Sequence, residues 1–240
     1  MKKAFLLFMG ISLGLLIGCN DFSPTTIQNS GITSKQEVDF TNFSQIEINT
    51  GFELFLKQDG TEFISIVADE NVLPHIEYFQ NGDKITFRMK KGSRASRRSV
   101  KIFISAKDVS ELSGSGGSSL VAESVLYRDK IKLSLSGGST FTGEINIIDK
   151  MSISQSGGSI SKISGNSVNL NANLSGGSKI IAPDYIVEYL DLNLSGGSSA
   201  DLTVTDEISV SASGGSMLKY SGEGRVVKSS LSGGSSIKVN

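Results

Sequence analysis

The tetrapeptide Ser-Gly-Gly-Ser (SGGS) occurs seven times in this chain, and it constrains the fold more than any other feature. The copies begin at residues 115, 136, 156, 175, 195, 213 and 232, so successive copies are 18 to 21 residues apart. Glycine and serine also make up flexible linkers. The residues that flank the tetrapeptide must therefore decide between a disordered tether and a repeated structural corner.

Apolar residues flank the tetrapeptide in a constant phase. When its first serine is numbered zero, position −5 is apolar in the second to seventh copies: Ile131, Met151, Leu170, Leu190, Ile208 and Val227. Positions −4 and −2 are polar, and apolar residues return at +5 and +7, with the poorest match in the third copy (Ser161 and Ile163). Period-two alternation on both sides of the glycines indicates strands with one buried face. A tether would not alternate in this way, so the tetrapeptide is predicted to be a corner.

A repeat of about 20 residues leaves few architectures. A propeller blade needs about 40 residues, and the Leu/Asn consensus of a leucine-rich repeat is absent. A meander of antiparallel hairpins would reverse the strand direction between successive copies. The best fit is an all-β fold, a parallel β-helix whose coils stack about 4.8 Å apart. Residues 38–108 alternate without the tetrapeptide and are expected to form less regular opening coils or a cap.

The glycines have a physical role in such a corner. A tight bend between two strands often needs a positive φ, which costs energy for residues with a Cβ, and stacked corners also leave little room. The predicted corner glycines are Gly137, Gly138, Gly157, Gly158, Gly176, Gly177, Gly196, Gly197, Gly214, Gly215, Gly233 and Gly234. The flanking serines are expected to satisfy backbone groups at the bend.

The first residues of the sequence are expected to form an export signal. Lys2 and Lys3 precede an apolar run over residues 4–17, which is too short to span a bilayer comfortably. The closing Leu-Ile-Gly-Cys resembles the lipobox of bacterial lipoproteins, which implies cleavage before Cys19 and lipidation of that residue. We therefore expect a signal peptide over 1–18, a lipidated cysteine and polar tether over 19–37, and one domain over 38–240. The implied location is the cell envelope, as an outer-membrane lipoprotein facing the periplasm or the outside.

Composition excludes several function classes. Cys19 is the only cysteine, so the domain has neither a disulfide nor a thiol nucleophile, and the net charge of −1 argues against nucleic acid as a partner. His75 is the only histidine, which disfavours a zinc site and makes it the one histidine available to a catalytic triad. The tetrapeptide lacks the lysine of a phosphate-binding loop. We expect no metal and no cofactor.

One set of acidic residues keeps an enzymatic alternative open. Polysaccharide lyases and glycosidases occur on β-helices, and a glycosidase needs paired carboxylates. The candidates for such a group are Asp184, Glu188, Asp191 and Asp201. Carboxylates at strand ends of a solenoid are more often solvated surface residues, so we expect no catalytic residue.

Residues 84–101 form an unusually basic stretch, with eight lysines and arginines and no acid. The simplest interpretation is a solvated hairpin tip between strands over 84–90 and 99–105. The functional interpretation is a contact with anionic lipid headgroups or an acidic glycan. Its candidate residues are Lys90, Lys91, Arg94, Arg97 and Arg98.

Position −2 of the repeat forms a second candidate surface. Stacking of the coils would align Ser134, Ser154, Asn173, Asn193, Ser211 and Ser230 into a flat hydroxyl and amide ladder. Such a face could bind a glycan, although any soluble sheet also needs a polar outer face.

The stretch from Ile48 to Phe87 (INTGFELFLKQDGTEFISIVADENVLPHIEYFQNGDKITF) resembles the opening of the head GIN domain family of adhesin-like proteins, and the LSGGSS steps resemble its glycine-serine repeats. The resemblance spans about residues 38–240. It implies an exported lipoprotein of Bacteroidetes-type bacteria with a right-handed β-helix and brings no catalytic residues. We therefore expect a lipid-anchored, non-catalytic protein with an adhesion, binding or structural role. A role as an envelope sensor or assembly partner, and self-association through the end coils, are further alternatives.

Overall fold

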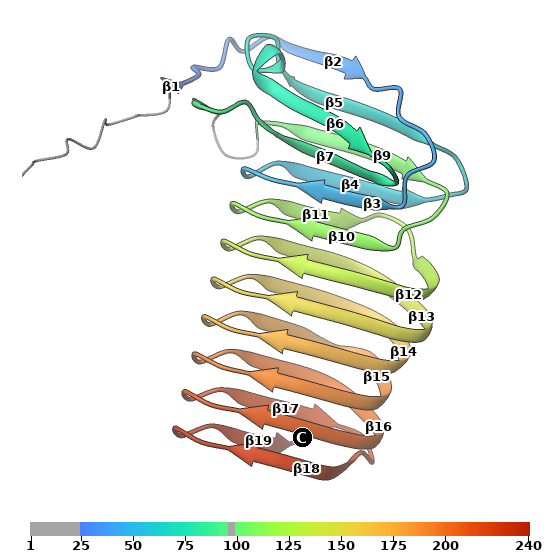
Figure 1. Ribbon diagram of the computed structural model, residues 1–240, viewed down its shortest axis with the longest axis vertical. Coiled ribbons are helices and arrows are strands. Elements are labelled where there is room, and N and C mark those ends of the chain that lie inside the picture. The colour runs from blue at the N-terminus through green and yellow to red at the C-terminus, as the bar shows by residue number, and fades with distance from the viewer. Residues whose placement is uncertain (1–24, 96–98) are drawn as a thin grey trace, which may run out of the picture.

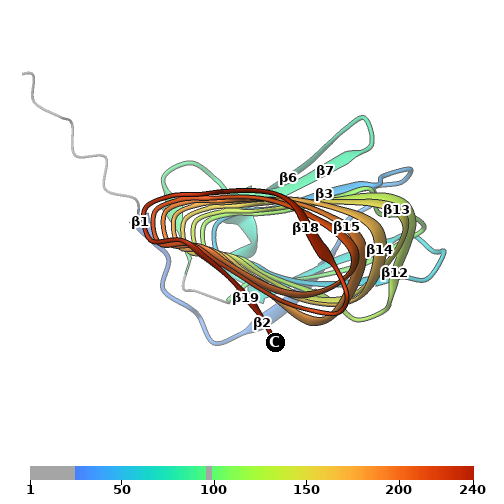
Figure 2. The ribbon, with the colours of Figure 1, turned by 90° about the horizontal axis from the view of Figure 1, so that it is seen from below.

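The computed structural model describes residues 25–95 and 99–240, and these form a β-solenoid (Figure 1). Parallel strands stack in about six turns of roughly 20 residues each, and the one helical element in the described residues is a short 3₁₀ helix, η1 (Leu73–His75). The predicted all-β, parallel, coil-stacking fold is confirmed. Figure 2 shows the flattened cross-section, which is narrow at one edge and wide at the other.

The regular coils share one path. Each long strand follows a corner along one face, bends at the wide edge, and continues along the other face to the next corner. The strands are β10 (Glu111–Gly114), β11 (Ser119–Ala122), β12 (Leu126–Leu135), β13 (Thr140–Gln155), β14 (Ile160–Leu174), β15 (Lys179–Leu194), β16 (Ser199–Ala212), β17 (Met217–Ser221), β18 (Arg225–Leu231) and β19 (Ser236–Val239). We call the side that leads into the corners the entry face and the side that leaves them the exit face.

The register of the stack is strict beside the corners and irregular at the wide edge. On the entry face, Leu133, Ile153, Ala172, Leu192 and Val210 align across successive coils without a shift. Most register shifts fall in the wide bend, for example between residues 147 and 150 and between 182 and 186. The wide bend therefore absorbs most of the variation in repeat length.

The core lies where the alternation predicts it, between the two faces. The −5, −3 and −1 positions of the central copies point inward and are almost fully buried. Two residues at inward positions of the third copy are polar, Gln155 at −1 and Ser161 at +5. With the Gln155 amide oriented to match its neighbours, its nitrogen donates to the Lys179 carbonyl (3.1 Å) and its oxygen accepts from the Ser161 hydroxyl (2.8 Å). The poorest match to the repeat is thus explained by two polar side chains that bond to each other within one coil.

The corners confirm the expected role of glycine and distinguish its two positions. Both glycines of every copy have a positive φ, as in Gly176 (+66°) and Gly177 (+84°). A Cβ on Gly176 would lie 3.0 Å from the backbone nitrogen of Gly157 in the preceding corner, whereas a Cβ on Gly177 would meet nothing within 4 Å. The first glycine is therefore required for stacking as well as for its φ.

The second serine of each corner binds the backbone, and it is buried in every copy of the tetrapeptide except the last. The hydroxyl of Ser178, for example, donates to the Ser175 carbonyl (2.7 Å) and lies 3.2 Å from the Gln155 carbonyl. The equivalent bond within the corner is 2.6 to 2.9 Å long in all seven copies. Because a buried hydroxyl without a partner is costly, this bond explains why serine follows the glycines.

An eighth corner precedes the first SGGS copy and was not expected from the sequence. It connects β3 (Gln45–Ile48) to β4 (Glu53–Gln58), and these strands pair in parallel with β10 and β11. Its residues are Asn49, Thr50, Gly51 and Phe52. Thr50 has a φ of +64° at the first-glycine position. Its hydroxyl accepts the Met89 N–H (3.1 Å), so here the side chain bonds to the strand above the corner.

The N-terminal end is a cap of mixed strands, in agreement with the expected irregular opening. It contains β2 (Thr33–Glu37), β5 (Phe63–Asp69), β6 (Ile76–Asn81), β7 (Lys84–Met89) and β9 (Lys101–Ala106). β7 and β9 continue the parallel stack above β3 and β4, and β6, β5 and β2 then pair antiparallel. β1 (Thr25–Thr26) pairs in parallel with β8 (Ser93–Arg94).

The structure differs from the sequence interpretation at two places in this cap. Residues 33–37, which the sequence places in the tether, form the edge strand β2. A polar edge strand needs only backbone hydrogen bonds, so its sequence shows no apolar alternation. The strands around the basic segment do not form a hairpin either. β7 pairs with β3 on the entry face and β9 pairs with β4 on the exit face, so the described residues that follow β7 (90–95), here called the corner loop, lie at the narrow edge.

The last coil exposes apolar residues at positions that are buried in the central coils. Leu231 (44% exposed) aligns with the buried Ala212 and Val239 (66%) aligns with the buried Tyr220, and no strand lies beyond them among the described residues. Self-association through this end stays a prediction.

Candidate functional site: the polar entry face

The entry face carries two outward columns of small polar side chains beside the narrow edge. The column at −2 consists of Glu47, Ser113, Ser134, Ser154, Asn173, Asn193, Ser211 and Ser230, and the strand register aligns all eight. The first residues of the corners form the second column: Asn49, Ser115, Ser136, Ser156, Ser175, Ser195, Ser213 and Ser232. The predicted ladder is thus present, and the corner serines double its width.

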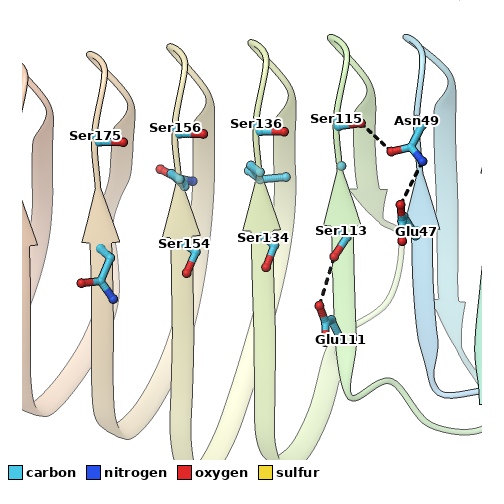
Figure 3. Close-up of a pocket in the computed structure, with 14 residues that line it drawn as sticks. Glu47, Asn49, Glu111, Ser113, Ser115, Ser134, Ser136, Ser154, Ser156 and Ser175 are labelled. Atoms are coloured by element: carbon cyan, nitrogen blue, oxygen red, sulfur yellow. Dashed lines mark hydrogen bonds between the residues drawn. The ribbon is translucent and has the colours of Figure 1, made fainter.

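A shallow groove of about 580 Å³ follows these columns (Figure 3). Its lining is Glu47, Asn49, Glu111, Ser113, Gly114, Ser115, Ser134, Leu135, Ser136, Ser154, Gln155, Ser156, Asn173 and Ser175. A second depression of about 320 Å³ shares Asn173 and Ser175 with it and extends to Ser213. The two together form one polar surface that runs along the solenoid axis, which suits an extended ligand better than a compact one.

Two carboxylates lie at the upper end of this groove, and both are paired with lysines. Asn49 Nδ2 donates to Glu47 Oε1 (3.0 Å), and Lys84 forms an ion pair with Glu47. Lys132 Nζ lies 3.0 Å from Glu111 Oε1. Burial raises the pKa of Glu47, but the hydrogen bonds from Asn49 and Lys84 and the charges of Lys84 and Arg88 outweigh it, so its pKa is below the ordinary value. Glu47 is therefore ionised at neutral pH and is unsuited to act as a general acid.

The central hydroxyls of the groove are available to a ligand. Within residues 25–95 and 99–240, no protein group bonds to the hydroxyls of Ser134, Ser136, Ser154 or Ser156, which point outward (Figure 3). Farther along the face, Asn193 Nδ2 donates to Asn173 Oδ1 (3.0 Å), so the amides form a ladder between coils. The face thus offers a row of donors and acceptors on a rigid sheet.

The four candidate catalytic carboxylates are not brought together. Asp191 points outward on the entry face, and Asp201 lies on the exit face, where it pairs with Lys219 (3.1 Å). Asp184 and Glu188 are exposed at the wide bend between the two faces. Among the described residues there is also no cluster of three or more histidine, cysteine, aspartate or glutamate side chains that could hold a metal ion.

His75 lies at the end of η1, and its Nδ1 is 3.0 Å from the hydroxyl of Ser93. This contact joins the cap to the corner loop that follows β7. Lys90 N–H donates to the His75 carbonyl (2.8 Å), and Ser93 N–H donates to the Lys90 carbonyl (3.0 Å). The histidine therefore fixes the loop in place.

The basic residues of segment 84–101 separate into two groups. Lys84 pairs with Glu47, and Arg88 pairs with Glu77 (2.6 Å) and lies over the ring of Phe79 (5.2 Å). Lys90, Lys91 and Arg94 are exposed in the corner loop. Of the remaining candidates, Arg97 and Arg98 lie outside the described residues, as does Cys19. No helix in the described part of the chain has the length and apolar character needed to cross a membrane.

Sequence reasoning missed the upper end of the groove. Glu47 and Asn49 belong to a coil without the tetrapeptide, and Glu111 precedes the first copy, whose −5 and −1 residues (Ser110 and Gly114) break the apolar pattern. One signal was present. The stretch Asn49-Thr50-Gly51-Phe52 lies between two alternating segments, as an SGGS copy does.

The fold and the face together define a class, a capped parallel β-solenoid with a polar groove on one side. The chain belongs to the family described as "Putative auto-transporter adhesin, head GIN domain", which matches residues 42–224. No curated protein matches the chain.

Solved structures share this fold at low sequence identity. The chain is similar to a putative adhesin of Bacteroides fragilis (TM-score 0.78, 18% identity, 89% of this chain and 98% of that chain). It is also similar to a putative adhesin of Parabacteroides merdae (TM-score 0.70, 20% identity, 90% and 99%). A third similar structure is a putative lipid binding protein of Parabacteroides distasonis (TM-score 0.66, 18% identity, 90% and 100%). At these identities the likeness shows the fold alone.

Proposed function

We propose that this protein is a non-catalytic binding module of the cell envelope, anchored by a lipid on Cys19, that holds a glycan chain along its entry face. The observation that carries the proposal is the doubled polar column, in which unbonded serine hydroxyls repeat along a shallow groove. Sugar hydroxyls both donate and accept hydrogen bonds, so a row of groups with the same capacity is complementary to them. A rigid scaffold limits the entropy cost of binding.

Several observations support binding over catalysis. A glycosidase needs two carboxyl groups at a defined separation, one of them with a raised pKa. The lowered pKa of Glu47 and the dispersed positions of Asp184, Glu188, Asp191 and Asp201 do not meet that need. The adhesin description of the family and of two structural neighbours agrees with a binding role.

Lipid as the bound ligand is less favoured than glycan. One structural neighbour is described as a putative lipid binding protein. An acyl chain requires an apolar cavity. The grooves described on the entry face are shallow and lined mainly by serine, asparagine and carboxylate groups.

The proposal is tested on a glycan array with the chain from Asn20 onward, which contains every described strand. The triple variant Ser134→Ala/Ser154→Ala/Asn173→Ala should weaken binding to any bound glycan by about 100-fold, because each lost hydrogen bond contributes about 1 kcal/mol. Thr140→Ala/Thr142→Ala/Ser199→Ala, on the exit face, is the matched control and should bind as the wild type does. Equal binding by both variants would contradict the proposal.

The anchor is tested separately. Mass spectrometry of the protein extracted from membranes should find a diacylglycerol on an N-terminal Cys19, and Cys19→Ala should abolish that modification. Protease treatment of intact cells then distinguishes the periplasmic side from the outer surface.

A further inference from the structure

The exposed cations of the corner loop lie next to the point where the chain enters the folded domain. We propose that Lys90, Lys91 and Arg94, the basic corner, contact the anionic phospholipid headgroups of the leaflet that holds the lipid anchor. The solenoid then stands with its N-terminal end on the membrane. This inference rests on the anchoring part of the proposed function.

Strand pairing holds the basic corner close to the anchor. β1 (Thr25–Thr26) pairs with β8 (Ser93–Arg94), and Ile27 N–H donates to the Arg94 carbonyl (2.8 Å). Both views show β1 at the narrow edge of the N-terminal end (Figures 1 and 2). Cys19 precedes Thr25 by six residues, and a residue spans at most about 3.5 Å. In any conformation of that segment, the lipid is therefore attached within about 20 Å of the strand that carries Arg94.

The charges of the basic corner are free to attract anions. Within the part of the chain that the structure describes, no acidic side chain forms an ion pair with Lys90, Lys91 or Arg94. Lys90 Nζ donates to the Pro74 carbonyl (2.6 Å), which leaves its charge unneutralised. The His75–Ser93 contact described above fixes the loop, so the three cations are presented together rather than on a free coil.

The distribution of charge along the narrow edge sets the orientation. The seven SGGS corners below the basic corner carry no charged residue. Electrostatic attraction to an anionic membrane therefore does not favour an orientation in which the whole narrow edge lies flat on it. The attraction is confined to one end. From the corner at Asn49 to the corner at Ser232, seven coil spacings of about 4.8 Å place the far end about 34 Å farther out. The entry-face groove then projects away from the bilayer, where it is accessible to a ligand.

Vesicle sedimentation tests the contact without the anchor. The chain from Asn20 onward should bind vesicles of phosphatidylcholine with phosphatidylglycerol at low ionic strength, and should bind neither pure phosphatidylcholine nor mixed vesicles in about 0.5 M salt. Since each charge contributes about a fivefold gain near an anionic surface, Lys90→Gln/Lys91→Gln/Arg94→Gln should lower the partition coefficient about 100-fold.

The control has the same change of charge at the far end, Arg225→Gln/Lys228→Gln/Lys238→Gln, and should retain binding. Equal losses in the two variants, or binding that does not depend on anionic lipid, would overturn the inference. Because this chain lacks Cys19, failure here is distinct from failure of lipid attachment, which the mass measurement reports.

Orientation is measured on the acylated protein. The thiol of Cys19, the only native cysteine, carries the lipid and cannot react with a dye. A dye can therefore be attached at one site alone, on Asn29→Cys near the basic corner or on Lys238→Cys in the last coil. A quencher attached to lipid headgroups should quench the first dye and not the second. Equal quenching would mean that the solenoid lies flat and would refute the upright orientation.

Discussion

Alanine at the two glycines of one corner should have unequal effects, and this inequality tests the stacking argument directly. Gly176 and Gly177 have φ values of +66° and +84°. An alanine in the left-handed region costs about 1–2 kcal/mol. The lower entropy of the unfolded chain offsets about 0.4–1 kcal/mol of that cost. Either substitution should therefore lower the free energy of unfolding by about 1 kcal/mol from its φ alone.

Only the first glycine carries a second cost. Its added Cβ would lie 3.0 Å from the backbone nitrogen and 3.5 Å from the Cα of Gly157. Those atoms belong to the corner of the preceding coil, which the adjoining strand ladders hold in register, so relief of the contact must separate two coils locally. Overpacking of this kind costs about 1–3 kcal/mol. The expected losses are about 3 kcal/mol for Gly176→Ala and about 1 kcal/mol for Gly177→Ala.

Urea denaturation measures the difference. With a slope of about 2 kcal/mol per molar urea, the two midpoints should differ by about 1 M, with Gly176→Ala unfolding first. The corner at Gly196 and Gly197 provides a replicate, because a Cβ on Gly196 lies 3.0 Å from the Gly176 nitrogen. Equal midpoints within a pair, or a larger loss at the second glycine, would refute the claim that close coil approach selects glycine.

Three further predictions concern polar groups in and beside the core. Gln155→Leu and Ser161→Ala should each lower the free energy of unfolding by about 1–3 kcal/mol, because each leaves a buried polar partner without a hydrogen bond. In a double-mutant cycle, the double variant should lose less stability than the sum of the two single losses. Burial raises the pKa of Tyr185 to about 12. The unfolded tyrosine ionises near pH 10 while the native one keeps its proton, so stability should fall by about 2 kcal/mol from pH 10 to 12, and Tyr185→Phe should flatten that part of the denaturation profile. The pKa of Glu47 is lowered, so its contribution to stability is present above about pH 4.5 and is lost as pH falls through the native pKa; acid denaturation of Glu47→Gln should show a smaller slope there.

Each of the three has a contrary outcome. Strictly additive losses at residues 155 and 161 would mean that the two side chains do not bond each other. An unchanged alkaline slope in Tyr185→Phe would assign that slope to other tyrosines. A steeper acid slope in Glu47→Gln would show that the ionised carboxylate of Glu47 destabilises the native state.

Much of the solenoid could be predicted because its coils repeat one local rule. Residues such as Leu170 and Leu192 occupy inward positions fixed by their distance from the next serine, and the structure buries them. The cap does not follow that rule. β2 is an edge strand with no apolar alternation, and β7 and β9 are assigned to opposite faces by pairing with β3 and β4, which no local pattern records.

The candidate site was predictable in part for the same reason. The −2 column follows from the repeat, and Ser154 and Asn173 were expected to align. The paired carboxylates at the upper end were not, because Lys84 reaches Glu47 from a strand 37 residues farther along the chain. Ser161 likewise looks like a poor match to the repeat, because no local pattern shows that its hydroxyl bonds across the core to the buried polar side chain of Gln155.

The tetrapeptide connects the fold to the proposed binding face. Its second serine, as in Ser178, points inward, and its hydroxyl donates a hydrogen bond to a carbonyl of the corner. Its first serine, as in Ser136, points its hydroxyl outward on the entry face. The glycines that permit close stacking therefore also set the spacing of that outward column at about 4.8 Å. A binding face made in this way can lengthen by whole coils without a change in its chemistry. Such an arrangement suits the binding of a long, repetitive polar ligand at a fixed distance from a membrane. The length of the binding face, the spacing of its hydroxyls and their exposure to the ligand all follow from one repeated corner.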